Sequence, residues 1–116
     1  VKQLDCVFCK IINKEIPSDI LYEDDDMIAF KDANPQAPVH FLVVPKKHID
    51  NIESLSEEDY PLLEKIFKRI NILAKEQGIA KDGFRIINNC NENGGQTVMH
   101  LHFHILGGRC LQWPPG

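Results

Sequence analysis

Hydrophobic positions in the first third of the chain follow two different periods. From Asp5 to Ile12 the apolar residues are spaced as on one face of a helix, and Pro17 follows the segment. Two short apolar runs, Ile20–Glu23 and Met27–Lys31, flank an acidic tract at 24–26. Adjacent aspartates on a tight turn point in different directions, so we interpret the tract as a solvated turn rather than a metal site. The pattern predicts a short helix and then a β-hairpin.

The middle of the chain predicts one buried strand and one long helix. Phe41–Val44 is continuously apolar, as in a buried strand, and Pro45 should end it. Ser56 with Asp59 three residues later predicts a capping box. A helical apolar face then continues until Gly78. It is formed by Leu62, Leu63, Ile66, Phe67, Ile70, Leu73 and Ala74.

The last third of the chain predicts two more strands. They are Phe84–Asn88 and Val98–Leu106, separated by a polar, glycine-containing loop at 89–96. The resulting order is helix, hairpin, strand, long helix, strand, strand, without regular β-α-β alternation. This order favours a single α+β domain, residues 1–116, with a mainly antiparallel sheet.

Composition and charge exclude several classes of function. With 43% hydrophobic and 26% charged residues among 116, the chain fits one globular domain. A net charge of −4 with scattered Lys and Arg argues against a nucleic-acid polymer as partner. No apolar run approaches the roughly 20 residues that cross a bilayer, and residues 1–6 lack the apolar core of a signal peptide. We therefore expect a cytoplasmic protein without a membrane partner.

Three imidazoles alternate with apolar residues near the carboxyl end. Successive strand side chains point to opposite faces, so His100, His102 and His104 should line one face. One histidine on a strand is often incidental, but three at this spacing indicate a function, because imidazole titrates near neutrality. Two kinds of chemistry are open. The rings either bind a metal ion or act as acid, base and nucleophile.

The segment before this strand favours phosphate as the ligand. Backbone N–H groups at Gly94 and Gly95 can approach an anion, and Gln96 and Thr97 add amide and hydroxyl donors. For the glycines alone, an ordinary loop with positive φ is the alternative. A neutral imidazole is a competent nucleophile at pH 7 and its phosphoryl adduct is open to attack by water. No metal or other cofactor is required for that step.

The residues Gln96–His104 resemble the Q-x-x-x-H-x-H-x-H signature of the histidine triad family. The similarity extends almost end to end, through Lys10–Ile12, Glu15–Pro17, Asp32–Val43, Pro45–Ile49 and Gly107–Arg109. The terminal Trp113–Gly116 resembles the nucleotide-binding branch, whose members act as purine nucleoside phosphoramidases, rather than the dinucleoside polyphosphate hydrolases. The resemblance implies hydrolysis of purine nucleoside 5′-phosphoramidates, with acyl-adenylates as a further candidate substrate, through a nucleotidyl-histidine intermediate.

The resemblance also implies an assembly. Two subunits, each with one long and one short helix, would join their five-stranded antiparallel sheets into a ten-stranded sheet. The carboxyl end of each subunit, with Trp113, would reach toward the partner's nucleotide site.

Matched position by position, the resemblance assigns roles to single residues. His102 matches the nucleophile, and His104 matches the residue that contacts the phosphate and protonates the leaving group. His40 and His100 match supporting imidazoles, and Asp32 matches the carboxylate that holds the ribose hydroxyls. Matches to the polar groups around the phosphate are Asn89, Gly95, Gln96 and Thr97, and matches to the purine slot are Val7, Phe8, Ile11, Ile16, Phe30 and Leu42. Without the resemblance, the apolar set could be plain core, Asp32 could cap the turn after it and His40 could be a core histidine.

Cys6 and Cys9 have the C-x-x-C spacing of metal ligands. Together with His48 and His100, and as in some bacterial relatives, they would form a closed tetrahedral zinc site with a structural role. The alternative is a pair of unmetallated thiols. Two other functions stay open at this point: a nucleotide sensor or scaffold, and a zinc-dependent hydrolase that uses the three strand histidines.

Overall fold

The sheet has five antiparallel strands and a helix on each face. The computed structural model describes residues 6–116. In chain order its elements are α1 (Val7–Ile12), β1 (Ile20–Glu23), β2 (Met27–Lys31), β3 (Val39–Pro45), the 3₁₀ turns Ile52–Ser54 and Glu57–Asp59, α2 (Tyr60–Glu76), β4 (Phe84–Ile87) and β5 (Phe103–Gly107). The strand order is β1-β2-β3-β5-β4, with antiparallel neighbours throughout. The predicted α+β class and the five-stranded sheet are confirmed.

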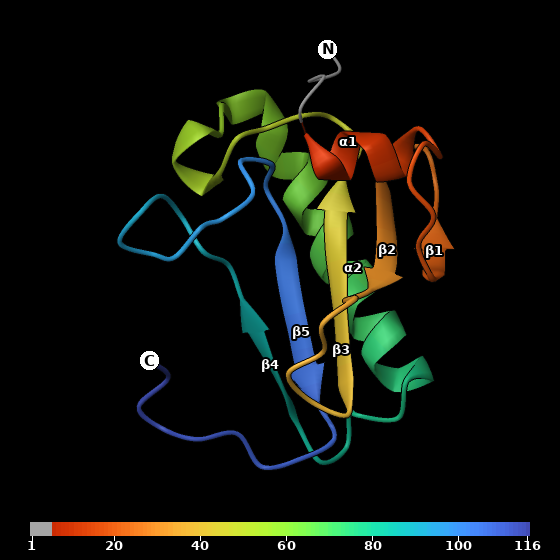
Figure 1. The fold of residues 1–116 in the computed structure, drawn as a ribbon, viewed down its shortest axis with the longest axis vertical. Helices are drawn as coiled ribbons and strands as arrows, with labels where there is room; N and C mark the ends of the chain where they lie inside the picture. The colour runs from red at the N-terminus through yellow and green to blue at the C-terminus, as the bar shows by residue number, and fades with distance from the viewer. Residues whose placement is uncertain (1–5) are drawn as a thin grey trace.

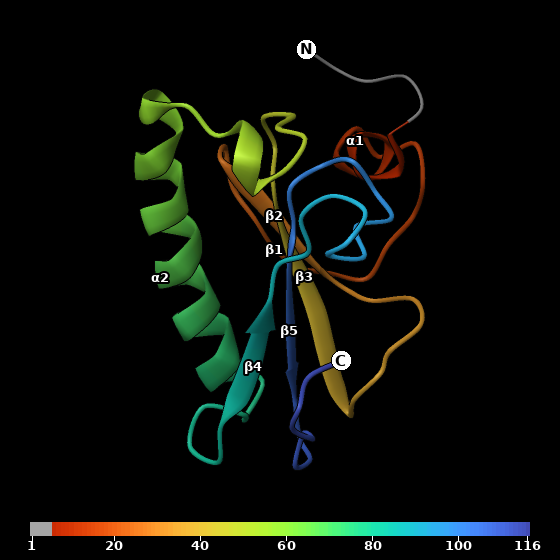
Figure 2. The ribbon, with the colours of Figure 1, turned by 90° about the vertical axis from the view of Figure 1, so that its left-hand side faces the viewer.

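The two helices divide the core into two clusters. In Figures 1 and 2, α2 runs along one face of the sheet, while α1 lies at one end of the opposite face. Met27 and Ala29 of β2 pack in the cluster under α2, whereas Ile28 and Phe30 pack in the cluster beside α1. Because both faces of the central strands are covered, these strands are apolar at nearly every position instead of alternating.

The long helix follows its predicted apolar face closely. Ile66, Ile70, Leu73 and Ala74 are buried. The predicted capping box is present, since the carboxylate of Asp59 accepts hydrogen bonds from the backbone N–H and hydroxyl of Ser56, but it caps the 3₁₀ turn Glu57–Asp59 and not α2, which begins at Tyr60. The exception is Phe67, which is 43% exposed and meets Phe103 edge-on at the border of the face. The helix ends at Glu76, and Gly78 follows with φ of +77°.

A pair of isoleucines on α2 tests this assignment of the core. Ile70 is 1% exposed, whereas Ile72 is 41% exposed. We expect Ile70→Ala to lower the free energy of unfolding by about 2–5 kcal/mol, because it removes buried methylenes and leaves a cavity. Ile72→Ala is the matched control and should change it by no more than about 0.5 kcal/mol. Denaturant titration measures both values, and equal losses would contradict the assignment.

The last strand is shorter than the sequence predicts. The predicted strand Val98–Leu106 begins only at Phe103, and the predicted Phe84–Asn88 ends at Ile87. Residues 98–102 do not pair with β3, because β3 ends at Pro45, which has no N–H donor. Other donors take over in residues 98–102: the Asn88 side chain donates to the His102 carbonyl at 2.9 Å, and the Leu101 N–H donates to the Ile49 carbonyl at 2.6 Å.

The amino-terminal elements agree with the pattern in type. The predicted helix 5–12 begins at Val7, with Cys6 as its N-cap, and Asp5 lies outside the described residues. In the acidic tract, the Asp24 carboxylate accepts hydrogen bonds from the N–H groups of Asp26 and Met27, so the tract forms the hairpin turn. Within residues 6–116 no helix is long and apolar enough to cross a bilayer.

Candidate active site

The three histidines lie on one face, although only His104 belongs to a strand. His102 is buried against Phe8 of α1, with ring centroids 4.8 Å apart, and its ring is 5.0 Å from that of His104. The intervening Leu101 and Phe103 pack in the opposite cluster, under α2. The predicted alternation of sides is therefore preserved even where strand pairing is absent, although residues 98–100 form a bend.

His102 is held in one tautomer. Its Nδ1 lies 2.7 Å from the carbonyl oxygen of His100. A carbonyl oxygen can only accept, so Nδ1 carries the proton and the neutral ring has its lone pair on Nε2. Burial lowers the pKa of His102 below its usual value, which keeps the ring neutral at pH 7. The nitrogen Nε2 is therefore available as a nucleophile.

A chain of hydrogen bonds fixes the tautomer of His104 as well. The N–H of Gln36 donates to Nδ1 of His40 at 3.0 Å, so neutral His40 carries its proton on Nε2. That nitrogen lies 3.0 Å from Nδ1 of His104, which must accept. His104 consequently carries its own proton on Nε2. Burial, reinforced by the neighbouring His102 and His40, lowers the pKa of His104 to about 4, so the ring is a neutral donor.

Asp32 lies beside this pair. One carboxylate oxygen is 3.4 Å from Nε2 of His40, and the other accepts the N–H of Asn34 at 2.8 Å. Burial nevertheless lowers the pKa of His40 despite the nearby carboxylate. The alternative that Asp32 caps the turn is thus confirmed, and the same carboxylate also lies beside His40 and His104. Asp32, His40 and His104 form one cluster of potential ligand atoms within 4.8 Å.

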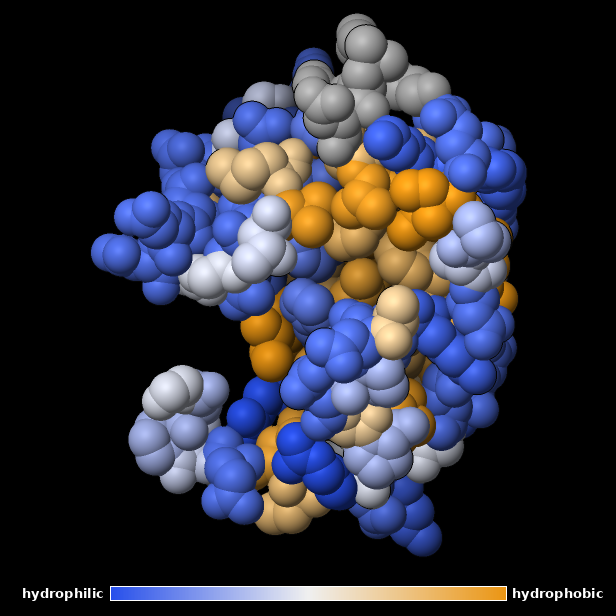
Figure 3. All heavy atoms as spheres, in the orientation of Figure 1, coloured by the Kyte–Doolittle hydropathy of each residue, from blue (hydrophilic) through white to orange (hydrophobic). Residues whose placement is uncertain are grey.

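The predicted purine-slot residues come together beside α1. Four of them, Phe8, Ile11, Phe30 and Leu42, are buried in one cluster, with Ile16 packed against it. Val7 is 37% exposed and lines a cavity of about 400 Å³. Figure 3 shows hydrophobic side chains gathered on this face of the molecule. An apolar wall therefore adjoins His102, which Phe8 contacts directly.

The polar loop differs from the expectation of a ready-made anion site. The N–H groups of Gly95 and Gln96 donate to the carbonyls of Glu92 and Asn91, which closes turns within the loop. Both hydrogen bonds donated by the Gln96 side-chain amide go to backbone carbonyls. The N–H groups of Gly95 and Gln96 and the Gln96 amide are therefore occupied within the protein, and their contact with a phosphate stays a prediction. Thr97 is exposed and lines the same cavity as Val7, and Asn89 is half-buried at the start of the loop.

Among the described residues, the predicted Trp113 makes no ring contact with a histidine. It is 79% exposed, in a carboxyl-terminal segment that projects from the body in Figure 3. The backbone of this segment is fixed by Arg85, which donates to the carbonyl of Gln112 at 2.9 Å. A contact of Trp113 with the nucleotide site of a partner subunit stays a prediction.

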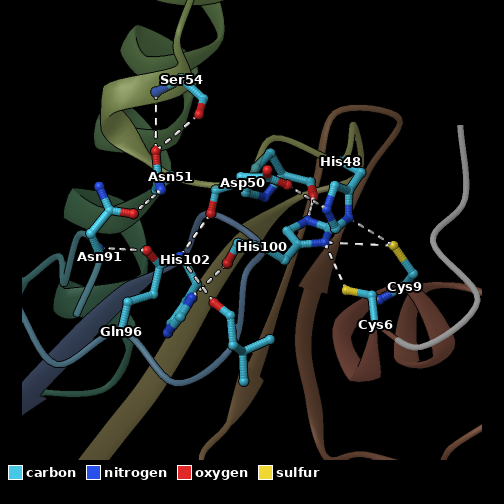
Figure 4. Close-up of polar contacts among 12 residues, drawn as sticks. Cys6, Cys9, His48, Asp50, Asn51, Ser54, Asn91, Gln96, His100 and His102 are labelled. Carbon is cyan, nitrogen blue, oxygen red and sulfur yellow. Dashed lines mark hydrogen bonds and ion pairs between the residues drawn. The ribbon is translucent and has the colours of Figure 1, made fainter.

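The predicted metal ligands do converge. Potential ligand atoms of Cys6, Cys9, His48 and His100 all lie within 4.8 Å of one another, and Figure 4 shows the four side chains directed at one point. The Cys6 and Cys9 sulfurs lie 3.2 and 3.6 Å from Nδ1 of His100, and the Cys9 sulfur lies 3.3 Å from Nδ1 of His48. Two thiols and two imidazoles are a donor set that zinc takes in closed tetrahedral sites.

Hydrogen bonds at Nε2 orient both imidazoles of this group. Nε2 of His100 donates to the Pro45 carbonyl at 2.8 Å, and Nε2 of His48 donates to the Asp50 carboxylate at 3.1 Å. Each Nδ1 lone pair therefore faces the thiols, as in metal-binding histidines. Burial lowers the pKa of His100 to about 4, so that ring is neutral. Burial raises the pKa of the Cys6 thiol, unlike the lowered pKa of a redox-active C-x-x-C motif.

The geometry contradicts a zinc site on the three strand histidines. Among the described residues, His100 groups with the two cysteines and His48, while His104 groups with Asp32 and His40. His102 belongs to neither group, and its Nδ1 proton is bound to a carbonyl. A metallohydrolase built on these three rings would need them to converge on one ion.

Sequence reasoning missed three supporting residues. Asn88 fixes the backbone at His102, the Gln36 N–H fixes His40, and Asp50 fixes His48. Only Asp50 carried a usable signal, because it follows His48 by two residues and an extended segment places i and i+2 on one side. The other two act through loop conformations that no short pattern encodes.

Several known proteins are similar to this chain over nearly its whole length. The profile of the family described as "Scavenger mRNA decapping enzyme C-term binding" matches residues 5–111. An uncharacterized HIT-like protein of Synechococcus elongatus is 49% identical over 112 residues, 97% of each chain, and one of Synechocystis sp. is 50% identical over the same shares. Among solved structures, a HIT family hydrolase from Legionella pneumophila has a TM-score of 0.94 and 46% identity, covering 97% of this chain and 100% of that one. A histidine triad protein from Clostridium difficile has a TM-score of 0.93 and 51% identity, covering 97% of each chain.

Proposed function

Because this chain belongs to the histidine triad (HIT) family, we propose that it hydrolyses purine nucleoside 5′-phosphoramidates through a nucleotidyl intermediate on His102. The observation that carries the proposal is the opposite tautomers of two neighbouring rings. His102 has a lone pair on Nε2, and His104 has a proton on Nε2. A nucleophile and a proton donor thus lie side by side, beside an apolar wall.

The reaction has two displacements. In the first, Nε2 of His102 attacks the α-phosphorus and forms an N–P bond while the bond to the leaving amine breaks; His104, which takes up a second proton beside the bound phosphate and Asp32, gives its Nε2 proton to that amine and is left neutral. In the second, water attacks the phosphorus of the adduct and gives a proton to Nε2 of His104. The bond to His102 then breaks and nucleoside 5′-monophosphate leaves. One difficult step becomes two easier ones.

The remaining pocket residues suit a nucleotide. The apolar slot of Phe8, Ile11, Phe30 and Leu42 would hold the purine. The carboxylate of Asp32 would accept hydrogen bonds from the ribose hydroxyls. Trp113 supports a homodimer with a joined ten-stranded sheet, because its exposed ring could complete the pocket of a partner subunit. Acyl-adenylates would present the same nucleotide half and are a second candidate substrate.

Zinc fits the group of Cys6, Cys9, His48 and His100. A bound ion would supply structural cross-linking there, between α1 and the segments that contain His48 and His100. The chemistry of the two displacements would remain with His102 and His104. Because zinc would have only a structural role, the proposal differs from metal-dependent hydrolysis.

Substrate choice tests the proposed class. We expect release of AMP from adenosine 5′-phosphoramidate to have a higher kcat/KM than cleavage of diadenosine tetraphosphate, by at least about 10-fold, because the terminal Trp113–Gly116 resembles the phosphoramidase branch. Chromatography of the products measures both rates under identical conditions. Faster cleavage of the tetraphosphate would assign the chain to another branch of the family.

A further inference from the structure

A chain of hydrogen bonds connects the metal-ligand group with the loop that precedes the catalytic histidines (Figure 4). It begins at His48, which donates to the carboxylate of Asp50 at 3.1 Å. The backbone carbonyl of Asp50 accepts from Nε2 of Gln96 at 2.7 Å, and Oε1 of Gln96 accepts the N–H of Asn91 at 2.9 Å. The chain thus runs from a proposed metal ligand into the loop 89–97.

Gln96 is fully occupied in this arrangement. Its amide nitrogen donates to two carbonyls, those of Asp50 and Val98 at 2.7 and 3.0 Å, and its amide oxygen accepts one N–H. An amide nitrogen has two protons, so no donor remains for a phosphate. The side chain therefore ties the two ends of the loop to the segment that follows His48.

Asn51 provides a second tie at the same place. It is 3% exposed, its amide nitrogen donates to the side-chain oxygen of Asn91 at 2.9 Å, and its oxygen accepts from the N–H and hydroxyl of Ser54. Among the described residues, the side-chain hydrogen bonds that join the loop 89–97 to distant parts of the chain all lead to Asp50 and Asn51. The loop's position consequently depends on where residues 48–51 are held.

We propose that Gln96 is a positioning residue that transmits the geometry of the metal-ligand group to the active-site loop. The expected effect of this residue on turnover rests on the proposed function. An ion bound by His48 would restrain that ring, and through Asp50 and Gln96 it would restrain the loop that carries Thr97. The same ion would hold His100, whose carbonyl fixes the tautomer of His102. The metal-ligand group would thereby support two walls of the site.

Hydrogen exchange with and without metal tests the coupling in the full-length chain. We expect Co²⁺ to slow amide exchange in residues 91–97 of the wild-type protein by about 3- to 10-fold, because it stabilises hydrogen bonds that are already formed by an amount comparable with the net contribution of one hydrogen bond. In Gln96→Met, which keeps the length of the side chain but removes its polar atoms, Co²⁺ should still bind and the slowing should disappear. Visible absorption of thiolate-bound Co²⁺ confirms occupancy in each sample.

Two further variants sharpen the result. Gln96→Glu keeps an acceptor for Asn91 but loses the donor to Asp50, and it should behave like Gln96→Met. Asn71→Ala removes an exposed amide from α2 and should retain the wild-type response to Co²⁺. Turnover should fall about 10-fold in Gln96→Met with metal affinity unchanged, as for residues that orient a site without touching substrate.

Equal slowing in wild type and Gln96→Met would overturn the inference, as would no slowing in wild type at full Co²⁺ occupancy. A wild-type protein that does not bind Co²⁺ would overturn it too. These outcomes do not depend on catalysis, so they are distinct from a failure of the proposed hydrolysis. If the proposed hydrolysis failed and the inference held, amide exchange would still respond to the metal although no nucleotide was released.

Discussion

Replacing His102 by alanine is expected to lower kcat for nucleoside phosphoramidate hydrolysis by at least about 10⁴-fold, as for loss of a covalent nucleophile. The variant lacks the Nε2 lone pair that would attack phosphorus. The affinity for nucleoside monophosphate should change little, because the apolar slot and Asp32 are untouched. Steady-state kinetics and equilibrium binding of AMP measure the two effects separately.

A second substitution controls for misfolding. His102→Asn keeps an amide donor close to the position of Nδ1, so the bond to the carbonyl of His100 can persist. It has no nucleophilic nitrogen, and we expect the same loss of kcat. Wild-type turnover in either folded variant would remove His102 from the mechanism. Tight nucleotide binding with negligible turnover in the wild type itself would instead favour a sensor or scaffold.

Zinc is expected to stabilise the protein strongly without being needed for chemistry. At a zinc concentration 1,000 times the dissociation constant, the free energy of unfolding should rise by about 4 kcal/mol. Cys9→Ser should abolish most of this rise, because Cys9 lies within contact distance of both histidines of the group. Denaturant titrations with and without zinc measure the difference.

The other cysteines provide the control. Cys90 lies outside the metal-ligand group, so Cys90→Ser should retain the full response to zinc. Chelated wild-type protein should keep activity under conditions in which it remains folded, lowered by no more than about 10-fold, because only the positioning of the site and not the chemistry depends on the metal. Loss of all activity on chelation, with the fold intact and activity restored by zinc, would favour a metal-dependent hydrolase.

Periodicity was sufficient to predict most of the fold. Alternation at 100–105 placed the histidines opposite Leu101 and Phe103, and helical spacing identified the buried face of α2. The predicted start of the last strand was wrong because it depends on a partner strand. The partner strand β3 ends at Pro45, which precedes the predicted start at Val98 by 53 positions. A local sequence pattern cannot take so distant a residue into account.

The candidate site was predictable in its side chains but not in their roles. The C-x-x-C spacing and the family signature identified residues that the structure brings together. The Gln96 amide was expected to bind phosphate, whereas it is used by carbonyls from two segments. Hydrogen-bond assignments of this kind depend on loop conformation, and many sequences of similar composition would form different loops.

Mass spectrometry of protein quenched with acid-free denaturant during turnover of adenosine 5′-phosphoramidate tests the central mechanism most directly. We predict a peptide whose mass has increased by one adenylyl group, with the modification on His102, and no such peptide from His102→Asn. Rapid formation of AMP with His102 unmodified throughout the burst, or with the adenylyl group on another residue, would contradict the mechanism.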